Sequence, residues 1–288
     1  MDRQPRGVAE PILRTEQVTV RFGAFTSLAG LDLTLDRGEM RVVIGPNGAG
    51  KTTLLDLITG KVRPTSGRVV FQPRHGQATD ITRLSESQIA GLGIGRKFQT
   101  PNVFKSLGVL DNLKLALRGS RSVLASLLGS FARDDRARVQ DILHTIGLTA
   151  KAAQPAGILA HGEKQWLELG MLMAQDSDLL LIDEPVAGMT PKETVRTGEL
   201  LLSLARKHTL LVIDHDMTFV RQIASKITVL DEGKIICQGT VDEVQRDPKV
   251  IEVYLGHDHE AASTIARPIA PIPAVAADWA TADAAMSA

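Results

Sequence analysis

The chain has 288 residues, enough for one large domain or two small ones, and its 43% hydrophobic content can supply a sizeable core. Its 33 basic and 33 acidic side chains balance, whereas nucleic-acid-binding proteins usually carry a basic excess, so we expect no nucleic-acid partner. The single cysteine, Cys237, excludes a disulfide framework. No run reaches the ~18 apolar residues of a membrane span, and the N-terminus lacks the apolar core of a secretory signal, so we expect a soluble protein.

The first part of the chain predicts short strands separated by turns. Apolar patterning favours strands at residues 12–20, 28–35, 41–44 and 68–71. Phe22, at the end of the first strand, could stack on a purine ring or equally belong to the core. We expect residues 1–10 to be flexible, residues 72–82 to form a polar loop, and a short helix to follow at 85–90.

Residues 41–60, RVVIGPNGAGKTTLLDLITG, read as a strand, a glycine-rich turn and a helix. Lys51 and Thr52 close the pattern G-x-x-x-x-G-K-[ST], which is typical of phosphate-binding loops. Glycines let consecutive backbone N–H groups point at the phosphates, and the helix N-terminus adds its partial positive charge. Lys51 can reach the β- and γ-phosphates, and the Thr52 hydroxyl can bind Mg²⁺. The stretch therefore predicts a site for a nucleoside triphosphate with Mg²⁺.

The middle of the chain changes character. Gln99 follows a predicted strand and comes shortly before Pro101, which breaks regular structure. From about residue 100 to residue 168 the apolar spacing is helical, and we expect helices at 111–118, 123–131 and 133–146. This region is predicted to be a helical subdomain inserted in an α/β core.

Two continuous apolar runs later in the chain predict central parallel strands that are buried on both faces. Residues 179–184, LLLIDE, end in Asp183 and Glu184, and His215 closely follows the second run at 209–213. A carboxylate at such a strand end can hold Mg²⁺, and a second acid can polarise the water that attacks the γ-phosphate. The His215 imidazole can hydrogen-bond that phosphate.

The C-terminal part of the chain predicts a hairpin with strands at 227–230 and 234–238, followed by a helix at 241–255 that is broken at Asp247-Pro248. Residues 257–288 are rich in Ala and Pro and are expected to be a disordered tail.

Residues 159–165, LAHGEKQ, precede a helix-prone run. A glycine just before a helix N-terminus favours an anion. The distance of this segment from the phosphate loop along the chain suggests that it serves a second nucleotide, supplied by a partner subunit.

These four pieces in this order resemble the ATP-binding cassette (ABC) ATPases, and the resemblance covers residues 12–256. It implies a P-loop NTPase (RecA-like) α/β fold with a mixed sheet, an N-terminal antiparallel β subdomain and an inserted α-helical subdomain. The implied catalytic residues are Glu184 as base, His215 as switch histidine, and Lys51. The implied ATP ligands are Phe22, Gly45, Pro46, Asn47, Gly48, Ala49, Gly50, Lys51, Thr52, Thr53, Gln99 and His215. The implied Mg²⁺ ligands are Thr52, Gln99 and Asp183. The implied signature loop, which closes over the ATP of a partner subunit, consists of Leu159, Ala160, His161, Gly162 and Glu163.

Two departures from the family pattern matter, one in the signature loop and one after the two strand-end acids. The usual signature serine is Ala160, which removes a hydroxyl contact to the partner's γ-phosphate, and the usual glutamine is Glu163. Gly162 keeps the backbone contact, so we expect weakened or retuned closure rather than loss of ATPase activity. The aspartate that usually follows the two strand-end acids is Thr190, so that side chain cannot link the two subunits in the usual way.

The resemblance implies an ATP-hydrolysing subunit of an ABC importer, working as a homodimer or as a heterodimer with a second ABC ATPase. The implied partners are two transmembrane permease subunits and, indirectly, an extracytoplasmic solute-binding protein, with the ATPase on the cytoplasmic face of the bacterial inner membrane. GIGRKFQTPNVF, GEKQWLELGMLM and EPVAGMTPKET look most similar to urea-importer ATPases. Lys164 and Trp166 distinguish the chain from branched-chain amino-acid members. Urea is therefore the expected solute, with branched-chain amino acids as the alternative.

Two further classes are weaker alternatives. Soluble ABC ATPases that act on DNA or ribosomes usually carry two cassettes or long coiled-coil insertions, and this chain has one cassette and no heptad run. A P-loop kinase or GTPase would need neither the signature loop nor His215.

Overall fold

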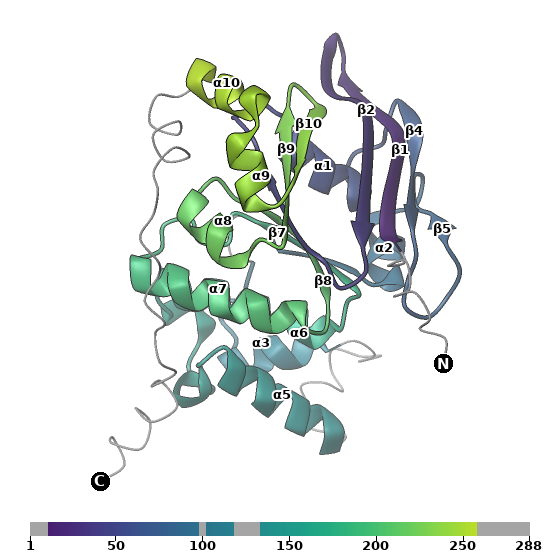
Figure 1. The fold of residues 1–288 in the computed structure, drawn as a ribbon. Coiled ribbons are helices and arrows are strands. Elements are labelled where there is room, and N and C mark those ends of the chain that lie inside the picture. The colour runs from purple at the N-terminus through teal and green to yellow at the C-terminus, as the bar shows by residue number, and fades with distance from the viewer. Residues whose placement is uncertain (1–10, 98–101, 118–132, 258–288) are drawn as a thin grey trace, which may run out of the picture.

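Two β-sheets and the helices around them form the described part of this computed structural model, which comprises residues 11–97, 102–117 and 133–257 (Figure 1). The first sheet is antiparallel and has the strand order β2-β1-β4-β5. Its strands are β1 (Pro11–Phe22), β2 (Phe25–Asp36), β4 (Ser66–Phe71) and β5 (Thr79–Asp80). An N-terminal antiparallel sheet was predicted, and the structure confirms it.

The second sheet is mixed and has six strands in the order β10-β9-β3-β8-β7-β6. They are β3 (Met40–Ile44), β6 (Ile94–Lys97), β7 (Leu179–Asp183), β8 (Thr209–Ile213), β9 (Lys226–Asp231) and β10 (Lys234–Gly239). Only β10 runs antiparallel to its neighbour. Every residue of β3, β7 and β8 is buried, and the continuous apolar runs of β7 and β8 predict this. Because these strands are parallel, the residues that follow them meet at one edge of the sheet.

The hydrophobic core lies on both faces of the second sheet, because alternate strand residues point to opposite sides. Leu179 and Leu181 pack with the first sheet and α1 (Lys51–Ile58), whereas Leu180 and Ile182 pack with the helices on the other face. The remaining helices are α2 (Glu86–Leu92), α3 (Val109–Ala116), α5 (Arg133–Thr145), α6 (His161–Gln175), α7 (Pro191–Ala205), α8 (Met217–Ile223), α9 (Val241–Arg246) and α10 (Pro248–His257), with 3-10 turns at Thr149–Lys151 and Ala156–Ile158.

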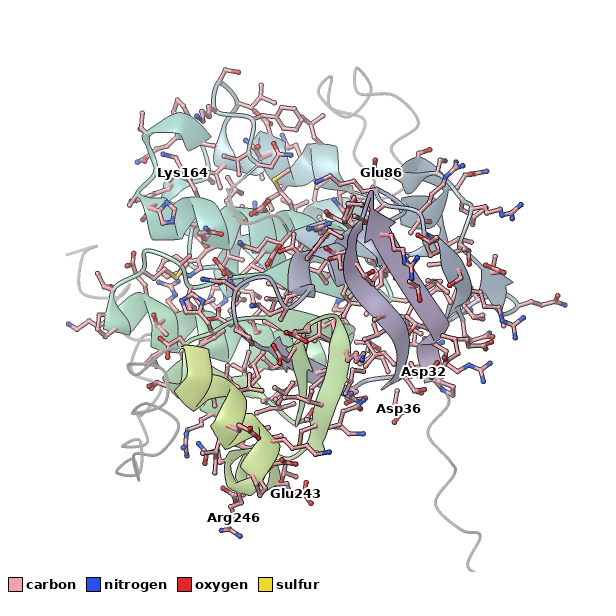
Figure 2. All side chains as sticks on the ribbon, turned by 90° about the horizontal axis from the view of Figure 1, so that it is seen from above. Asp32, Asp36, Glu86, Lys164, Glu243 and Arg246 are labelled. Carbon is pink, nitrogen blue, oxygen red and sulfur yellow. The ribbon has the colours of Figure 1, made fainter. Side chains whose placement is uncertain are left out.

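Helices α3 and α5 pack on α6 on the side of the molecule away from α9 and α10 (Figure 1). The same separation places Lys164 on α6 far from Glu243 and Arg246 on α9 (Figure 2). These helices lie in the region that the sequence predicts to be an inserted helical subdomain. Within the described residues, no helix is long and apolar enough to cross a bilayer.

Several elements differ from the sequence prediction. The polar loop expected at 72–82 contains β5, a two-residue strand that exists only because it pairs with β4. Helices α7 and α8 were not predicted, although each begins at a polar residue that caps its first turn, Thr190 and Asp216. The helix expected at 123–131, Gln99, residues 1–10 and the tail after His257 lie outside the described residues.

Candidate functional site

The phosphate loop joins β3 to α1 and packs tightly against neighbouring backbone. Gly45 and Gly50 have φ angles of 152° and 100°, which L side chains rarely adopt. A Cβ atom on Gly45 would lie 2.1 Å from the carbonyl oxygen of Leu230, and one on Gly50 would lie 2.6 Å from that of Ser27. Both positions therefore require glycine for backbone conformation and for space.

The Lys51 side chain folds back and bonds the backbone of the phosphate loop. Its Nζ donates hydrogen bonds to the carbonyl oxygens of Gly45 and Pro46, at 2.6 and 2.9 Å. Burial lowers the pKa of Lys51, and the nearby Glu184 and Asp183 carboxylates oppose that shift. The lysine of the phosphate loop and the two acids at the end of β7 therefore share one electrostatic environment, as expected for groups that bind one polyphosphate.

Asp183 is the last residue of β7 and Glu184 comes directly after it, but the two acids have different surroundings. Asp183 is buried, and its Oδ2 lies 3.5 Å from the Arg96 guanidinium at the end of β6. Burial raises the pKa of Asp183, and the Arg96 charge opposes the rise. Glu184 has a φ of 42°, a left-handed conformation that is uncommon for residues other than glycine. Such strain is concentrated at functional sites.

Glu184 and His215 are brought together by the pairing of β7 with β8. The backbone N–H of Glu184 donates to the carbonyl of Ile213 at 2.9 Å. The Oε1 of Glu184 lies 3.6 Å from Nδ1 of His215, whose side chain is 72% exposed. An acid that could orient water and an imidazole that could contact phosphate thus lie side by side at the open edge of the sheet.

Asp214 shapes the turn that presents His215. Its Oδ1 accepts the backbone N–H groups of His215 and Asp216, at 2.8 and 2.9 Å, while the residue is only 1% exposed. Burial raises the pKa of Asp214 to about 6, although the two N–H bonds favour its charged form. The sequence patterns assign this residue no role, and only the tertiary structure reveals its burial.

We predict that Asp214→Asn stabilises the protein at pH 8. The folded-state pKa is raised, so the native state binds more protons than the unfolded state between about pH 4 and pH 6. Stability therefore falls as pH rises through that window, and the cost remains above it. The amide removes a cost of about 3 kcal/mol at pH 8 while its oxygen can still accept both N–H bonds. Urea unfolding at pH 4 and pH 8 measures the difference.

The matched control for that prediction is Asp216→Asn. Asp216 caps α8 by accepting the N–H groups of Thr218 and Phe219, at 2.8 and 3.1 Å. Asn is also a good cap, so this variant should keep the pH dependence of the parent protein. Equal stability of Asp214→Asn and the parent at pH 8 would contradict the account given for Asp214.

The oxygen donors at the site suit Mg²⁺. Thr52 is exposed at the first turn of α1, and the Asp183 carboxylate lies near Lys51, where phosphate would bind. Mg²⁺ usually takes one or two carboxylates together with waters and substrate phosphates rather than a cage made of protein alone. In keeping with this, no cluster of three or more His, Cys, Asp or Glu ligands occurs in the described ranges. Gln99, the third predicted ligand, lies outside those ranges.

The signature segment, residues 159–163, has different neighbours from the phosphate loop. Ala160 has no side-chain oxygen to cap α6, but the Glu163 carboxylate accepts its backbone N–H at 3.1 Å and also bonds Lys151 at 2.6 Å. The Nε2 of His161 lies 3.2 Å from the carbonyl oxygen of Ala187. Glu163, predicted to face the partner's nucleotide, is therefore engaged within its own subunit.

Thr190 has a structural role that its departure from the family pattern does not indicate. Its hydroxyl accepts the N–H of Glu193, and the Glu193 carboxylate accepts the N–H of Thr190, so the two residues form a capping box at the start of α7. The replacement of aspartate by threonine at this position thus keeps a good helix cap.

Two aromatic residues end the hairpin between β1 and β2. Phe22 pairs directly with Phe25 across the strands, and the two are 51% and 60% exposed. Near this end of the hairpin, Ser27 of β2 is tied to α1 by the hydrogen bond between Ser27 Oγ and Thr53 Oγ1, at 2.8 Å. Sequence reasoning named Phe22 as a purine contact and missed Phe25, which a cross-strand pairing would have indicated.

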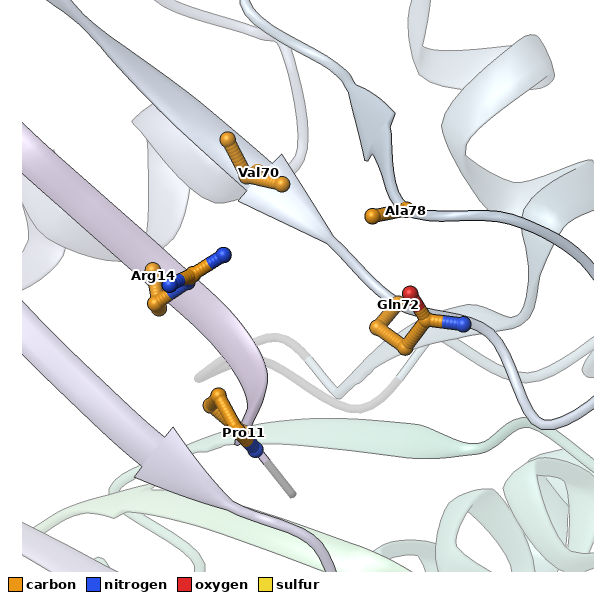
Figure 3. A pocket seen from close by; sticks show the side chains of 5 residues that line it. All are labelled: Pro11, Arg14, Val70, Gln72 and Ala78. Atoms are coloured by element: carbon orange, nitrogen blue, oxygen red, sulfur yellow. The ribbon is translucent and has the colours of Figure 1, made fainter.

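A hollow of about 400 Å³ lies elsewhere on the molecule, over the antiparallel sheet. Figure 3 shows that its lining comes from β1, β4 and the segment before β5. The lining residues are Pro11, Arg14, Val70, Gln72 and Ala78. The set contains no residue of the predicted nucleotide site, which instead forms an open surface at the edge of the second sheet.

Comparison with known proteins relates this geometry to a family. The family model described as ABC transporter matches residues 28–187, and one described as branched-chain amino acid ATP-binding cassette transporter matches residues 234–260. LivG of Salmonella typhimurium, a high-affinity branched-chain amino acid transport ATP-binding protein, is 34% identical and is matched over 86% of this chain and 99% of its own. A methionine import ATP-binding protein of Rhodococcus jostii is 38% identical, over 83% of this chain and 69% of its own.

A solved structure of an ATP-binding cassette of an ABC transporter in its ADP conformation has a TM-score of 0.73 and 31% identity, covering 86% of this chain and 99% of that one. The predicted fold class is therefore confirmed.

Proposed function

Because the chain belongs to the ABC transporter family of ATPases, we propose that it is the ATP-hydrolysing subunit of an importer for branched-chain amino acids. The observation that carries the ATPase part is the meeting of Lys51, Asp183, Glu184 and His215 at one edge of the second sheet. The match of the C-terminal residues 234–260 to the branched-chain amino-acid model supports the choice of solute.

The residues divide the work of hydrolysis. The backbone N–H groups of the phosphate loop and the Lys51 ammonium hold the β- and γ-phosphates. When ATP binds, Lys51 gives up its two hydrogen bonds to the carbonyl oxygens of the loop and contacts the phosphates instead. Thr52 and Asp183 would hold Mg²⁺, which neutralises charge on the phosphates when it is bound. Glu184 accepts a proton from the attacking water, and His215 hydrogen-bonds the γ-phosphate. Fixed charges and N–H groups supply most of the rate enhancement.

The exposure of the site supports a dimer. Phe22, Thr52 and His215 are all exposed, so a nucleotide bound among them would be open to water on one side. Water exclusion strengthens the electrostatic interactions that stabilise the transition state. The signature segment of a second subunit, identical or related, would provide the missing cover. Ala160 lacks a hydroxyl for this purpose, so Gly162 would supply its backbone N–H once the Glu193 side chain, which packs against this buried glycine, moves away.

A permease would dock beside the helices α3 and α6. Residues 104–107 and 155–158 run side by side there, and the N–H of Gly157 donates to the carbonyl of Lys105 at 2.9 Å. Their flanking apolar side chains face water, with Phe104 54% and Ile158 70% exposed. Two exposed apolar side chains on adjoining segments suit contact with a membrane subunit on the cytoplasmic face.

We predict that Phe104→Ser combined with Ile158→Ser lowers recovery of the permease about tenfold, because both apolar anchors are lost. ATP hydrolysis by the isolated subunit should not change. Co-purification from membranes and phosphate release measure the two effects. Leu202→Ser, which removes an exposed leucine on α7, is the matched control and should retain the permease. Full recovery with the double variant would contradict this docking surface.

Urea is the second candidate solute, because the motifs around Lys164 and Trp166 resemble urea-importer ATPases. The structure gives Trp166 a packing role, since its Nε1 donates to Thr197 Oγ1 at 3.0 Å and the Arg196 guanidinium lies 4.1 Å from the ring centroid. The LivG relative is named for branched-chain amino acids, which favours them over urea. The solute itself would be selected by the permease and an extracytoplasmic binding protein.

The test is purification of the complex from membranes, identification of the permease and of the second ATPase, and uptake of labelled leucine and urea. Leucine uptake that is lost with Glu184→Gln supports the proposal. Uptake of urea alone would transfer the function to the second candidate, and recovery of the ATPase without any membrane subunit would contradict an importer role.

A further inference from the structure

Two consecutive cations end strand β6 and point to opposite faces of the sheet, as neighbouring strand residues must. On one face, Arg96 lies 2.5 Å from Asp56 of α1, the helix that follows the phosphate loop. On the other face, Lys97 Nζ lies 3.7 Å from Glu168 of α6, the helix that begins within the signature segment. One short strand thus contacts the two helices that would face the nucleotides of a dimer.

The Lys97–Glu168 pair is deeply buried. The Lys97 side chain is 0% exposed and that of Glu168 is 7% exposed. The other carboxylate oxygen of Glu168 accepts the backbone N–H of Asn102 at 3.2 Å. Glu168 therefore contacts the chain both before and after residues 98–101, a stretch of sequence that includes Gln99.

Lys97 also lies beside the end of β7. Its Cα pairs with that of Ile182, the residue before Asp183, in the parallel ladder of β6 and β7. Arg96, the strand neighbour of Lys97, contacts Asp183 at 3.5 Å. The pair with Glu168 therefore joins α6 to the strand ends that carry the acids beside the phosphate loop.

A buried ion pair is a weak source of net stability, because desolvation of both charges offsets their attraction. Removing one partner is costly, since the other charge is left buried. Apolar replacement of both is often neutral or stabilising. The buried pair at this position is therefore better explained by the geometry that it imposes on its neighbours than by a contribution to the free energy of unfolding.

We infer that Glu168, acting through Lys97, is a positioning residue that fixes the N-terminal half of α6, and with it the signature segment, relative to Asp183. The inference rests on the proposed ATPase function, because only a correctly placed signature segment can cover the partner's nucleotide. Loss of the pair should therefore slow hydrolysis while leaving ATP binding to a single subunit unchanged.

The experiment compares the full-length protein with Glu168→Gln and with the double variant Lys97→Met, Glu168→Met. The glutamine can still accept the N–H of Asn102, and the double variant removes both buried charges, which secures a folded comparison. We expect kcat to fall about tenfold in both, with the ATP dissociation constant within about twofold of the parent. Amide hydrogen exchange of residues 161–167 without nucleotide should be faster in both variants.

Arg41→Met is the matched control for loss of a buried ion pair. Arg41 is 0% exposed and contacts Glu39 at 2.5 Å near the start of β3, at the opposite end of that strand from the phosphate loop. The Arg41→Met variant should have a lower midpoint temperature of thermal unfolding. Its kcat per folded molecule and its amide hydrogen exchange in residues 161–167 should be unchanged. Parental kcat or parental exchange in the double variant overturns the inference. Absence of hydrolysis by the parent overturns the proposed function instead, and the exchange measurement still decides the role of the pair.

Discussion

Glu184→Gln is expected to reduce the rate of ATP hydrolysis by about 10²–10⁴-fold, the range that a positioned general base contributes. Glutamine has nearly the shape of glutamate, and the backbone N–H of residue 184 can still donate to the carbonyl of Ile213. The glutamine side chain, however, cannot accept a proton from water. ATP binding should persist, and the ATP-bound dimer should accumulate if, as we propose, hydrolysis is what allows the two subunits to separate. Phosphate release, ATP binding and size-exclusion chromatography with ATP measure the three quantities.

The matched control for this prediction is Glu232→Gln. Glu232 also has a left-handed backbone, with a φ of 44° against 42° at Glu184, and it lies in the turn between β9 and β10. The control therefore changes the same functional group on the same strained backbone and should leave turnover unchanged. Normal hydrolysis by Glu184→Gln would remove Glu184 as the base. Loss of ATP binding would instead assign it to the nucleotide contacts.

The fold was predictable where a buried strand consists of consecutive apolar residues. Strands β7 and β8 are apolar throughout, and the structure ends β7 at Asp183 and β8 at Ile213, close to the predicted positions. Strand β5 was not predictable, because only its pairing with β4 distinguishes Thr79 and Asp80 from a polar loop. Helix α7 was missed although Thr190, Pro191 and Glu193 form a recognisable helix start.

The candidate site likewise contains residues that the sequence alone identifies and one that it does not. The sequence alone is enough to name four candidates, because each lies at or next to the end of a strand or helix and within a motif of known chemistry: Lys51, Asp183, Glu184 and His215. Glu168 could not be found, because its role depends on a buried contact with a strand some 70 residues earlier in the chain, and nothing in LELG signals that contact.

Glu163 shows a different limit of sequence reasoning. Its place in the signature segment implies a contact with the partner's nucleotide, whereas its carboxylate bonds Lys151 and the backbone of Ala160 in its own subunit. With alanine at the cap position, the N-terminus of α6 has no side-chain cap of its own and uses Glu163 instead. The two substitutions in the signature segment are thus physically linked, which residue identities taken one at a time cannot show.

Lys51→Ala is expected to weaken ATP binding by about 10²-fold or more, because a partly buried charge that contacts two phosphates is lost. The folded state should lose little, about 1 kcal/mol or less, since burial already disfavours the ammonium and only two carbonyl contacts disappear. Calorimetric titration with ATP and urea unfolding without nucleotide separate the two effects.

Lys61→Ala is the control for that prediction, because Lys61 follows the same helix, is 52% exposed and contacts Asp56 at 3.6 Å. A surface pair of this kind contributes about 0–1 kcal/mol, so ATP affinity and stability should both stay near those of the parent. If Lys51→Ala bound ATP as tightly as Lys61→Ala, the loop backbone alone would be sufficient for binding. The carbonyl bonds of Lys51 would then be its main role, and Glu184 and Asp183 would be the partners that keep it charged there.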